Sequence, residues 1–378
     1  MKSILIVIDS LEYGGAEKVL YTYLQHWNLN KYNITIVPIV DKGVYSSKIK
    51  NLDGITFSPV ISSSSSFEKN ILHKILYKLI YNYLSPKWVY KLFIPKKRDI
   101  EVSFCEGFVT KLMAYSSNKK AKKIAWIHTD LVNNNWPLSI GVFKDKSEEI
   151  DTYAAYDSIV GVSQIVCDGF KESFGLSNIS CIYNPLENNE IKILAAKAVS
   201  GNNKAQIHLV SVGRLVYDKG YDLLIQSIGI LLSKGIIVDL TIIGEGVLRK
   251  QLENLIQDSK LSEQVHLIGF QDNPYQYMQG ADIYVSSSRF EGFSLAIAEA
   301  MILGLPIIST RCAGPLELLD NGNAGLMVEC SAVSLADGIY KMVKQPETLE
   351  HYRNKSKERQ NFFSIENSIQ MTNQLFEE

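Results

Sequence analysis

The segment IYVSSSRFEGFSLAIAEA, residues 283–300, decides the fold. It opens with Ile283–Ser286, a short run typical of a buried strand, and continues into an apolar helix over Leu295–Leu303. Ser294 stands directly before that helix, where its hydroxyl can accept a hydrogen bond from a free N–H group of the first turn. A strand that passes through a short loop into a helix is the repeating unit of α/β proteins.

Short, largely apolar runs of the same kind alternate with helical patterns along the whole chain. Because both faces of such a run are apolar, it suits a strand of a parallel sheet that helices cover on both sides. We expect strands at Ile4–Ile8, Ile34–Val40, Ile100–Phe104, Lys123–Ile127, Ser158–Val162, His208–Val212, Val238–Ile243, Val265–Ile268, Ile283–Ser286 and Pro306–Ile308. So many strands in 378 residues exceed one doubly wound sheet and predict two α/β domains.

A polar segment that contains Ser200–Lys204 interrupts this alternation and marks a domain boundary. We predict an N-terminal domain over residues 1–184, a linker over residues 185–204 and a second domain over residues 205–360.

Composition excludes several classes of function. The net charge of −1 gives no reason to expect a nucleic-acid partner. The five cysteines include no Cys-x-x-Cys pair, so neither a disulfide framework nor a zinc site is indicated, and a cytoplasmic protein is expected. No run approaches the roughly 18 apolar residues of a membrane span. Because no Asp-x-Asp pair occurs, we expect no metal ion.

Residues 290–300, predicted to form a loop followed by the first turns of a helix, suit a bound diphosphate. Free N–H groups and the positive end of the helix dipole attract anions, and Gly292 lets the backbone approach a ligand closely. Glu291 lies in the loop, where it can hold a sugar hydroxyl, and Glu299 lies about one turn inside the helix, where it can reach a ribose diol. Either glutamate alone is most simply a surface charge, but the pair at this spacing after a strand indicates a site.

A second candidate site is SVGRLVYDKG, residues 211–220, after the first strand of the second domain. Loops at this position commonly bind ligands in α/β sheets. Arg214 and Lys219 can converge on a diphosphate and neutralise its charge. For either residue alone, a solvated side chain is an equally good interpretation.

Two weaker signals lie in the first domain. Gly14 and Gly15 form a strand-to-helix turn that lets the backbone approach a bound group, but they do not match the Gly-x-Gly-x-x-Gly pattern of nicotinamide enzymes. His128 ends a predicted strand, and Asp130 follows as a residue that can orient it. A lone histidine is more often structural, so the strand end is what makes His128 a candidate.

These motifs resemble the retaining GT-B glycosyltransferases of family 4 over nearly the whole chain. Glu291 and Glu299 look like the Glu-x7-Glu element of that family, and Gly213–Gly220 looks like its phosphate clamp. The resemblance implies two Rossmann-like domains facing each other across a cleft, with the acceptor on the first and the nucleotide sugar on the second. It also implies that residues 361–378 form a helix that returns to the first domain.

The resemblance further implies a role for each candidate residue. The implied catalytic residues are His128, Glu291, Arg214 and Lys219. The implied donor-binding residues are Gly14, Gly15, Arg214, Lys219, Gly244, Phe270, Gly292, Phe293, Ser294, Leu295 and Glu299. The loop Thr310–Pro315 matches the family only loosely and is given no role.

The implied activity is transfer of a hexose or hexosamine with retention of anomeric configuration, without a metal ion or cofactor. The donor is expected to be a UDP-sugar. The acceptor is expected to be a saccharide or polyprenyl-linked saccharide in the synthesis of cell-surface polysaccharide, such as lipopolysaccharide or capsule. An NDP-sugar 2-epimerase of the same fold and a non-catalytic sugar-binding scaffold are the alternatives.

The region Lys69–Lys123 holds 13 basic residues interleaved with aromatic side chains. We expect one helix face in it to belong to the core, because apolar residues recur at helical spacing: Leu72, Ile75, Leu76, Leu79, Ile80 and Tyr83. Two interpretations of the basic residues stay open. They form either a solvated helix face or a surface that binds anionic membrane at the inner face of the cell.

Overall fold

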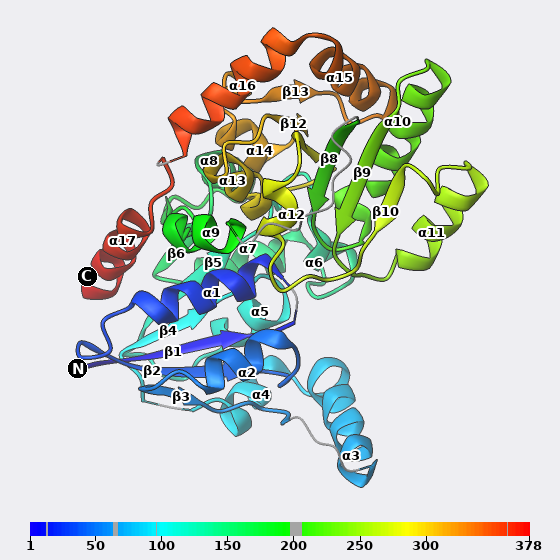
Figure 1. Ribbon diagram of the computed structural model, residues 1–378. Coiled ribbons are helices and arrows are strands. Elements are labelled where there is room, and N and C mark those ends of the chain that lie inside the picture. The colour runs from blue at the N-terminus through cyan, green and yellow to red at the C-terminus, as the bar shows by residue number, and fades with distance from the viewer. Residues whose placement is uncertain (13, 63–66, 96, 197–205, 361) are drawn as a thin grey trace. The chain divides into compact units, whose positions relative to one another are not determined.

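The computed structural model describes the chain except for residues 13, 63–66, 96, 197–205 and 361. The described residues divide into two compact units (Figure 1). The first unit consists of Met1–Pro185 together with Glu366–Glu378, and the second of Leu186–Ile365. The chain therefore leaves the first unit once and returns to it in its last residues.

The first unit is built on a seven-stranded sheet with the order β3-β2-β1-β4-β5-β6-β7, in which all strand pairs are parallel. Its strands are β1 (Lys2–Ile8), β2 (Tyr32–Pro38), β3 (Ile55–Phe57), β4 (Ile100–Ser103), β5 (Lys122–Ile127), β6 (Ser158–Gly161) and β7 (Ile179–Cys181). The side chains of Ile4–Ile8 are buried because helices cover both faces of the central strand.

Helices connect the strands of the first unit. They are α1 (Gly15–His26), α2 (Val44–Lys50), α3 (Phe67–Lys78), the π-helix η1 (Leu79–Tyr83), α4 (Pro86–Phe93), α5 (Phe108–Ala114), α6 (Trp136–Ser139), α7 (Lys146–Ala154), α8 (Gln164–Phe174) and, at the end of the chain, α17 (Ile365–Glu377). The ring of Phe376 in α17 lies 5.4 Å from that of Trp27 and 5.7 Å from that of Tyr32. These contacts attach the last helix to the core of the first unit.

The second unit contains a six-stranded parallel sheet with the order β10-β9-β8-β11-β12-β13. Its strands are β8 (Ile207–Val212), β9 (Val238–Ile243), β10 (Val265–Leu267), β11 (Ile283–Ser286), β12 (Ile307–Thr310) and β13 (Leu326–Val328). The helices are α9 (Asn188–Ala195), η2 (Tyr217–Lys219), α10 (Tyr221–Ser233), α11 (Arg249–Asp258), α12 (Tyr275–Gln279), α13 (Leu295–Ile302), α14 (Ala313–Leu318), η3 (Asp320–Gly322), α15 (Ala332–Lys344) and α16 (Pro346–Arg359).

The strand order reverses once in each sheet, between β1 and β4 in the first unit and between β8 and β11 in the second. At such a switch point the two following loops diverge and leave a crevice at the carboxyl ends of the strands, where α/β proteins bind ligands. The loops after β1, β8 and β11 carry the glycine pair, the Arg214–Lys219 motif and the Glu291–Ser294 motif, respectively.

The expected α/β fold with two parallel-sheet domains is confirmed. Each of the ten predicted runs overlaps a strand, and Ser294 is the N-cap of α13. The strands β3, β7 and β13 were not among the predicted runs. Each has three residues and lies at a sheet edge, so it carries too little apolar pattern to stand out from the loops.

The predicted core face between Leu72 and Tyr83 is wrong. Ile80 is fully buried and Leu76 is half-buried, but the other four residues are exposed: Leu72, Ile75, Leu79 and Tyr83. Helical spacing of apolar residues indicates that a helix has an apolar face, but it does not say whether another element covers that face. Figure 1 shows α3 projecting from the sheet of its own unit.

Candidate functional site

The strongest cluster lies at the carboxyl ends of β8 and β11 in the second unit. Lys219 Nζ forms an ion pair with Glu291 Oε1, and Ser288 Oγ donates a hydrogen bond of 3.1 Å to the same oxygen. Lys219 ends η2, whereas Glu291 and Ser288 lie in the loop after β11. The fold therefore brings together two motifs that lie far apart in the sequence. The lysine of one motif and the glutamate of the other are both half-buried.

Arg214 stands in the loop between β8 and η2 with an exposed side chain. Among the residues that the structure describes, its guanidinium has no ion-pair partner. Arg289 is different: it donates two hydrogen bonds, of 2.8 and 2.7 Å, to the Asp222 carboxylate and lies 4.2 Å from the Tyr217 ring centre. Of these two arginines, Arg214 is the one available to a bound anion.

Helix α13 begins beside the Lys219–Glu291 pair. Its N-cap hydroxyl, Ser294 Oγ, accepts a hydrogen bond from the N–H group of Ile297, as the sequence predicted. The N–H groups of the first turn and the positive end of the helix dipole favour negative charge at this position. The cluster thus combines a lysine, an exposed arginine and a helix N-terminus at one switch point, a set that suits a diphosphate.

The loop after β12 makes hydrogen bonds to the backbone of this cluster, although no role was predicted for it. Thr310 Oγ1 donates a hydrogen bond of 2.5 Å to the carbonyl of Ser288, and the N–H group of Gly314 donates one of 2.9 Å to the carbonyl of Glu291. A Cβ atom at Gly314 would lie 2.8 Å from the Cα atom of Phe293, so only glycine fits there. Such long-range contacts leave no local signal in a sequence.

Two glycines bring the loops after β8 and β9 into contact. Gly244 has a φ of 147°, and a Cβ atom on it would lie 1.9 Å from the carbonyl oxygen of Gly213. Its N–H group donates a hydrogen bond of 2.9 Å to the carbonyl of Gly269. Gly244 is therefore required for the packing of these loops, which include the backbone next to Arg214.

Glu299 and Phe270 differ in how a ligand can reach them. Glu299 is only 3% exposed, and Tyr275 Oη donates a hydrogen bond of 3.4 Å to its Oε1 atom. Phe270 follows β10 and is 40% exposed.

In the first unit, His128 follows β5 and its ring lies 5.0 Å from that of Phe104. Burial lowers the pKa of His128 to about 3, and a hydrogen bond with the backbone of Phe104 only partly offsets this effect. The Nε2 atom is buried and has no hydrogen-bond partner among the described residues. The imidazole is therefore neutral at physiological pH, and its unpaired nitrogen is covered by neighbouring atoms.

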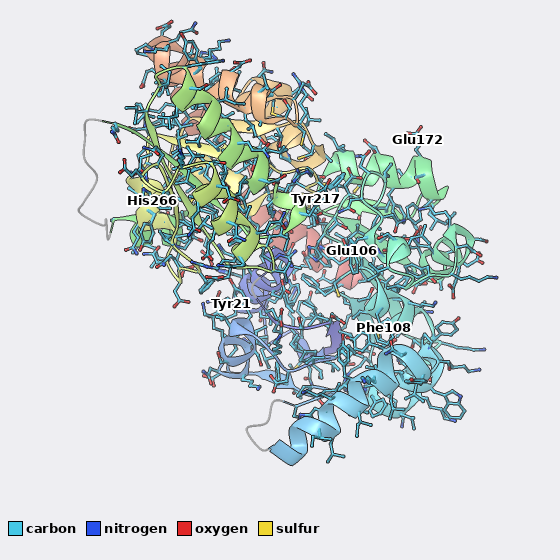
Figure 2. All side chains as sticks on the ribbon, turned by 90° about the vertical axis from the view of Figure 1, so that its right-hand side faces the viewer. Tyr21, Glu106, Phe108, Glu172, Tyr217 and His266 are labelled. Atoms are coloured by element: carbon cyan, nitrogen blue, oxygen red, sulfur yellow. The ribbon has the colours of Figure 1, made fainter. Side chains whose placement is uncertain are left out.

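Glu106 is a site residue that the sequence did not reveal. It follows β4 and is labelled in Figure 2. Its Oε1 atom accepts hydrogen bonds from the N–H groups of His128 and Thr129 and, at 3.0 Å, from Thr129 Oγ1. Burial raises the pKa of this carboxyl, and these hydrogen bonds oppose the shift. Glu106 thus fixes the backbone that carries His128.

The expected role of Asp130 in orienting His128 is not what the structure shows. Asp130 Oδ1 accepts hydrogen bonds of 3.1 and 3.2 Å from the N–H groups of Val132 and Asn133. This is the usual geometry of an aspartate that caps its own turn. Asp130 therefore shapes the loop after His128.

The predicted glycine turn lies at the start of α1, where Gly14 is the N-cap and Gly15 the first helical residue. A Cβ atom at Gly14 would lie 2.0 Å from a carboxylate oxygen of Glu17, so that carboxylate folds back over the turn. At the start of the same loop, directly after β1, Tyr81 Oη donates a hydrogen bond to Asp9. Burial raises the pKa of Asp9, and this hydrogen bond lowers it.

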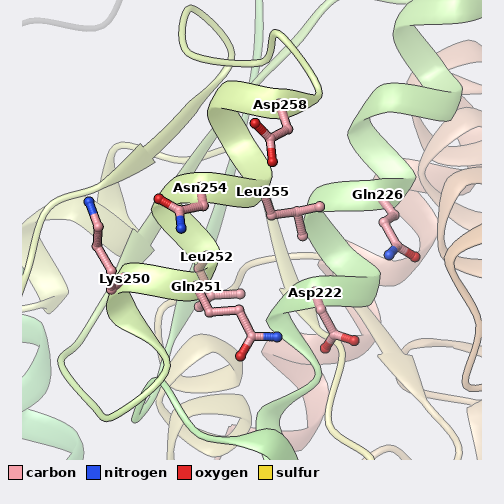
Figure 3. A pocket seen from close by; sticks show the side chains of 8 residues that line it. All are labelled: Asp222, Gln226, Lys250, Gln251, Leu252, Asn254, Leu255 and Asp258. Carbon is pink, nitrogen blue, oxygen red and sulfur yellow. The ribbon is translucent and has the colours of Figure 1, made fainter.

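A pocket of about 570 Å³ lies elsewhere in the second unit, between α10 and α11 (Figure 3). Six of its eight lining residues are polar or charged; the eight are Asp222, Gln226, Lys250, Gln251, Leu252, Asn254, Leu255 and Asp258. None of the predicted site residues lines it. The pocket therefore does not include the Lys219–Glu291 pair or Arg214, although Asp222, the partner of Arg289, lines it.

Comparisons with known proteins show what the chain is similar to. Residues 193–359 match the family described as glycosyl transferases group 1. The chain is 29% identical over 372 residues to a Campylobacter jejuni protein, and the match covers 96% of both chains. That protein is named N-acetylgalactosamine-N,N'-diacetylbacillosaminyl-diphospho-undecaprenol 4-alpha-N-acetylgalactosaminyltransferase. The chain is also 32% identical over 137 residues to the lipopolysaccharide core biosynthesis glycosyltransferase LpsE of Rhizobium meliloti, covering 36% of this chain and 38% of LpsE.

Among solved structures, a Staphylococcus aureus TarM variant in complex with fondaparinux, alpha-GlcNAc-glycerol and UDP gives a TM-score of 0.76. The alignment covers 100% of both chains at 17% sequence identity. At this identity the likeness establishes a shared fold.

Proposed function

We propose that this chain, which carries a group 1 glycosyltransferase domain at residues 193–359 and has the GT-B fold, transfers a hexose or hexosamine from a nucleotide sugar in cell-surface polysaccharide synthesis. The observation that carries the proposal is the cluster of Lys219, Glu291 and Arg214 beside the N-terminus of α13. A nucleoside diphosphate presents the charge that this cluster can bind, and a sugar presents hydroxyl groups for Glu291.

The proposed donor is a UDP-sugar. UDP is part of the TarM complex, whose fold this chain shares. In the proposed pose, Arg214, Lys219 and the backbone of Ser294–Ala296 hold the diphosphate, with Gly292, Phe293 and Leu295 forming the surrounding loop. Phe270 and Gly244 border the nucleoside, and Glu299 accepts hydrogen bonds from the ribose. The glycine turn Gly14–Gly15 is proposed to face the sugar diphosphate from the first unit.

The proposed reaction retains the anomeric configuration. The acceptor hydroxyl attacks the anomeric carbon on the face that the leaving diphosphate occupies, and a phosphate oxygen takes the hydroxyl proton. Arg214, Lys219 and the helix dipole stabilise the negative charge that develops on the diphosphate. This chemistry uses neither a metal ion nor a nucleophilic carboxylate, because charge stabilisation and proton transfer are supplied by the protein cations and the leaving group.

His128 is proposed to contact the transferred sugar. A neutral imidazole with an unpaired Nε2 atom accepts a hydrogen bond from a sugar hydroxyl, whereas an imidazolium cannot. Its low pKa, about 3, keeps the ring in the accepting form over the physiological range.

The proposed acceptor is a saccharide, in particular one linked to a polyprenyl diphosphate. The support is the Campylobacter jejuni relative, whose name specifies an undecaprenol-linked acceptor and which matches this chain over 96% of its length. A lipid-linked acceptor would bring a cytoplasmic enzyme to the inner face of the cell membrane. No helix among the described residues is long and apolar enough to cross a membrane.

The test is to measure sugar transfer directly. Purified protein is incubated with UDP-hexoses and UDP-N-acetylhexosamines, with and without a polyprenyl-linked saccharide, and the released UDP is measured. We expect UDP release that depends on the acceptor, continues in the presence of a chelator and yields a product whose anomeric coupling constant matches that of the donor. Proton exchange at C2 without an acceptor would instead identify a 2-epimerase, and binding without turnover would identify a scaffold.

A further inference from the structure

We propose that α3, η1 and α4 form a docking surface for anionic lipid on the first unit. Eight large apolar side chains are exposed within 22 residues of this segment: Ile71, Leu72, Ile75, Tyr77, Leu79, Tyr83, Trp88 and Leu92. Soluble surfaces normally scatter such side chains singly, and a dense group marks an interaction site.

Except for Tyr77, whose ring stacks on that of Tyr81, the exposed apolar side chains of α3 and η1 fall on one side of the helix. Leu72, Ile75 and Leu79 follow each other at spacings of three and four residues and are 63%, 50% and 40% exposed. Ile80 is fully buried on the side facing the unit. Because the outward side is apolar and the inward side already packs, the outward side is built to meet something other than this unit.

Helix α4 repeats this arrangement at shorter length. Val89 and Tyr90 are fully buried, and Tyr90 Oη donates a hydrogen bond of 2.8 Å to Glu101. Trp88 and Leu92, four residues apart, are 52% and 61% exposed. The Lys91 Nζ atom lies 4.8 Å from the Trp88 ring centre. An aromatic ring beside a lysine suits the boundary between lipid headgroups and acyl chains.

The positive charge of this surface favours an anionic partner. Residues 71–98 contain no Asp or Glu, and four exposed lysines flank the apolar side chains: Lys74, Lys78, Lys87 and Lys91. A second copy of this chain would bring the same lysines to the contact and would be repelled. An anionic lipid headgroup complements the lysines, while the acyl region receives the apolar side chains.

The docking surface is attached to the carboxyl ends of the strands in the first sheet, where His128 also lies. Tyr81 in η1 donates a hydrogen bond to Asp9, directly after β1. Its ring also lies 4.4 Å from that of Phe108, which Figure 2 labels at the start of α5. If the proposed function holds, this arrangement keeps lipid-bound acceptor near the strand ends of the first unit. The lipid surface itself does not depend on that function.

Vesicle flotation with the full chain tests the proposal. The probes are vesicles of phosphatidylcholine alone and of phosphatidylcholine mixed with phosphatidylglycerol, at low and high salt. The variants are Leu72→Ser with Ile75→Ser, Trp88→Ser with Leu92→Ser, and Lys87→Gln with Lys91→Gln. The matched control is Ile237→Ser with Val333→Ser, which removes two exposed apolar side chains from the second unit.

We expect wild type and the control to bind the anionic vesicles and to dissociate at high salt. Each lysine removed should weaken binding about fivefold, which corresponds to about 1 kcal/mol per basic residue. Each apolar pair removed should weaken it about tenfold or more. Thermal stabilisation by a UDP-sugar, measured on the same samples, should be unchanged in every variant, which separates this surface from the donor site.

Three results would overturn the proposal. Wild type could fail to bind the anionic vesicles, or the variants could bind them as strongly as wild type does. Alternatively, sedimentation could reveal a wild-type dimer that the Leu72→Ser, Ile75→Ser variant does not form, which would make this surface an interface between two copies. Loss of UDP-sugar binding with intact vesicle binding would contradict the proposed function and leave the lipid surface standing.

Discussion

His128 is the residue with the largest consequence for pH dependence. Its pKa is about 3 in the folded protein and about 6.5 in an unfolded chain. Between these values the unfolded chain binds a proton that the folded chain does not. Folding stability therefore falls as pH decreases from about 6.5 toward 3, by up to about 1.4 kcal/mol per pH unit from this group.

Chemical denaturation of wild type and His128→Gln at a series of pH values measures this effect. We expect the variant to lose less stability on acidification than wild type does. Parallel curves for the two proteins would show that the imidazole is not held neutral by burial.

Glu106 shows what one buried carboxylate does for the strand ends around it. Glu106→Ala removes the acceptor of two backbone N–H groups, and each buried N–H group left unpaired costs about 1–3 kcal/mol. Glu106→Gln keeps an oxygen at the same place and should lose much less. Denaturation measures the stability, and the His128 ring signals in an NMR spectrum report the local structure. Glu172→Ala, at an exposed glutamate on α8, is the control. Equal losses of stability in Glu106→Ala and Glu106→Gln would contradict this role of Glu106.

At the scale of the elements, the contact between the loops after β8 and β9 depends on a glycine and should tolerate no larger residue. Gly244→Ala places a Cβ atom 1.9 Å from the Gly213 carbonyl at a φ that side chains rarely adopt. We expect a loss of about 1–3 kcal/mol in stability and weaker donor binding, because the backbone next to Arg214 has to move.

Gly229→Ala is the matched control for that substitution. Gly229 lies inside α10, and the nearest atom to its added Cβ would be at 3.8 Å. Removing a glycine from a helix interior should stabilise by about 0.5–1 kcal/mol. Denaturation and donor titration of both variants provide the measurement, and similar behaviour of the two would contradict the role assigned to Gly244.

The elements also show what can be predicted from sequence. Apolar runs identify the long strands, and Ser294 marks the start of α13, because both signals are local. The contacts of Glu106 with His128 and of Gly314 with Phe293 join residues far apart in the chain, so no local pattern reveals them. The apolar side of α3 was misassigned to the core for a related reason, since periodicity does not identify the partner of a helix face.

At the scale of the whole molecule, each unit has its own sheet, core and switch point, and α17 belongs to the first unit although it ends the chain. Phe376 is fully buried against Trp27 and Tyr32. Phe376→Ala should destabilise the first unit by about 3–5 kcal/mol. Because two units need not unfold together, amide hydrogen exchange of β1 and β8 is followed separately.

Met371→Ala, at an exposed position of the same helix, is the control for Phe376→Ala. We expect faster exchange in β1 for Phe376→Ala and unchanged exchange in β8. Unchanged protection of β1 would mean that α17 does not contribute to the stability of the first unit.

The most direct test of the central claim is donor binding by the cluster at the ends of β8 and β11. Thermal shift and ligand-observed NMR with UDP-, GDP- and ADP-sugars are recorded for wild type, Arg214→Gln and the control Lys341→Gln. At about 100 times its dissociation constant, a ligand stabilises the fold by about 2.7 kcal/mol. We predict that a UDP-sugar stabilises wild type and the control, and that it binds Arg214→Gln at least about tenfold more weakly, because a hydrogen bond to a charged group contributes about 1.5–3 kcal/mol. No binding of any nucleotide sugar, or equal binding by Arg214→Gln, would contradict the assignment of this cluster as the donor site.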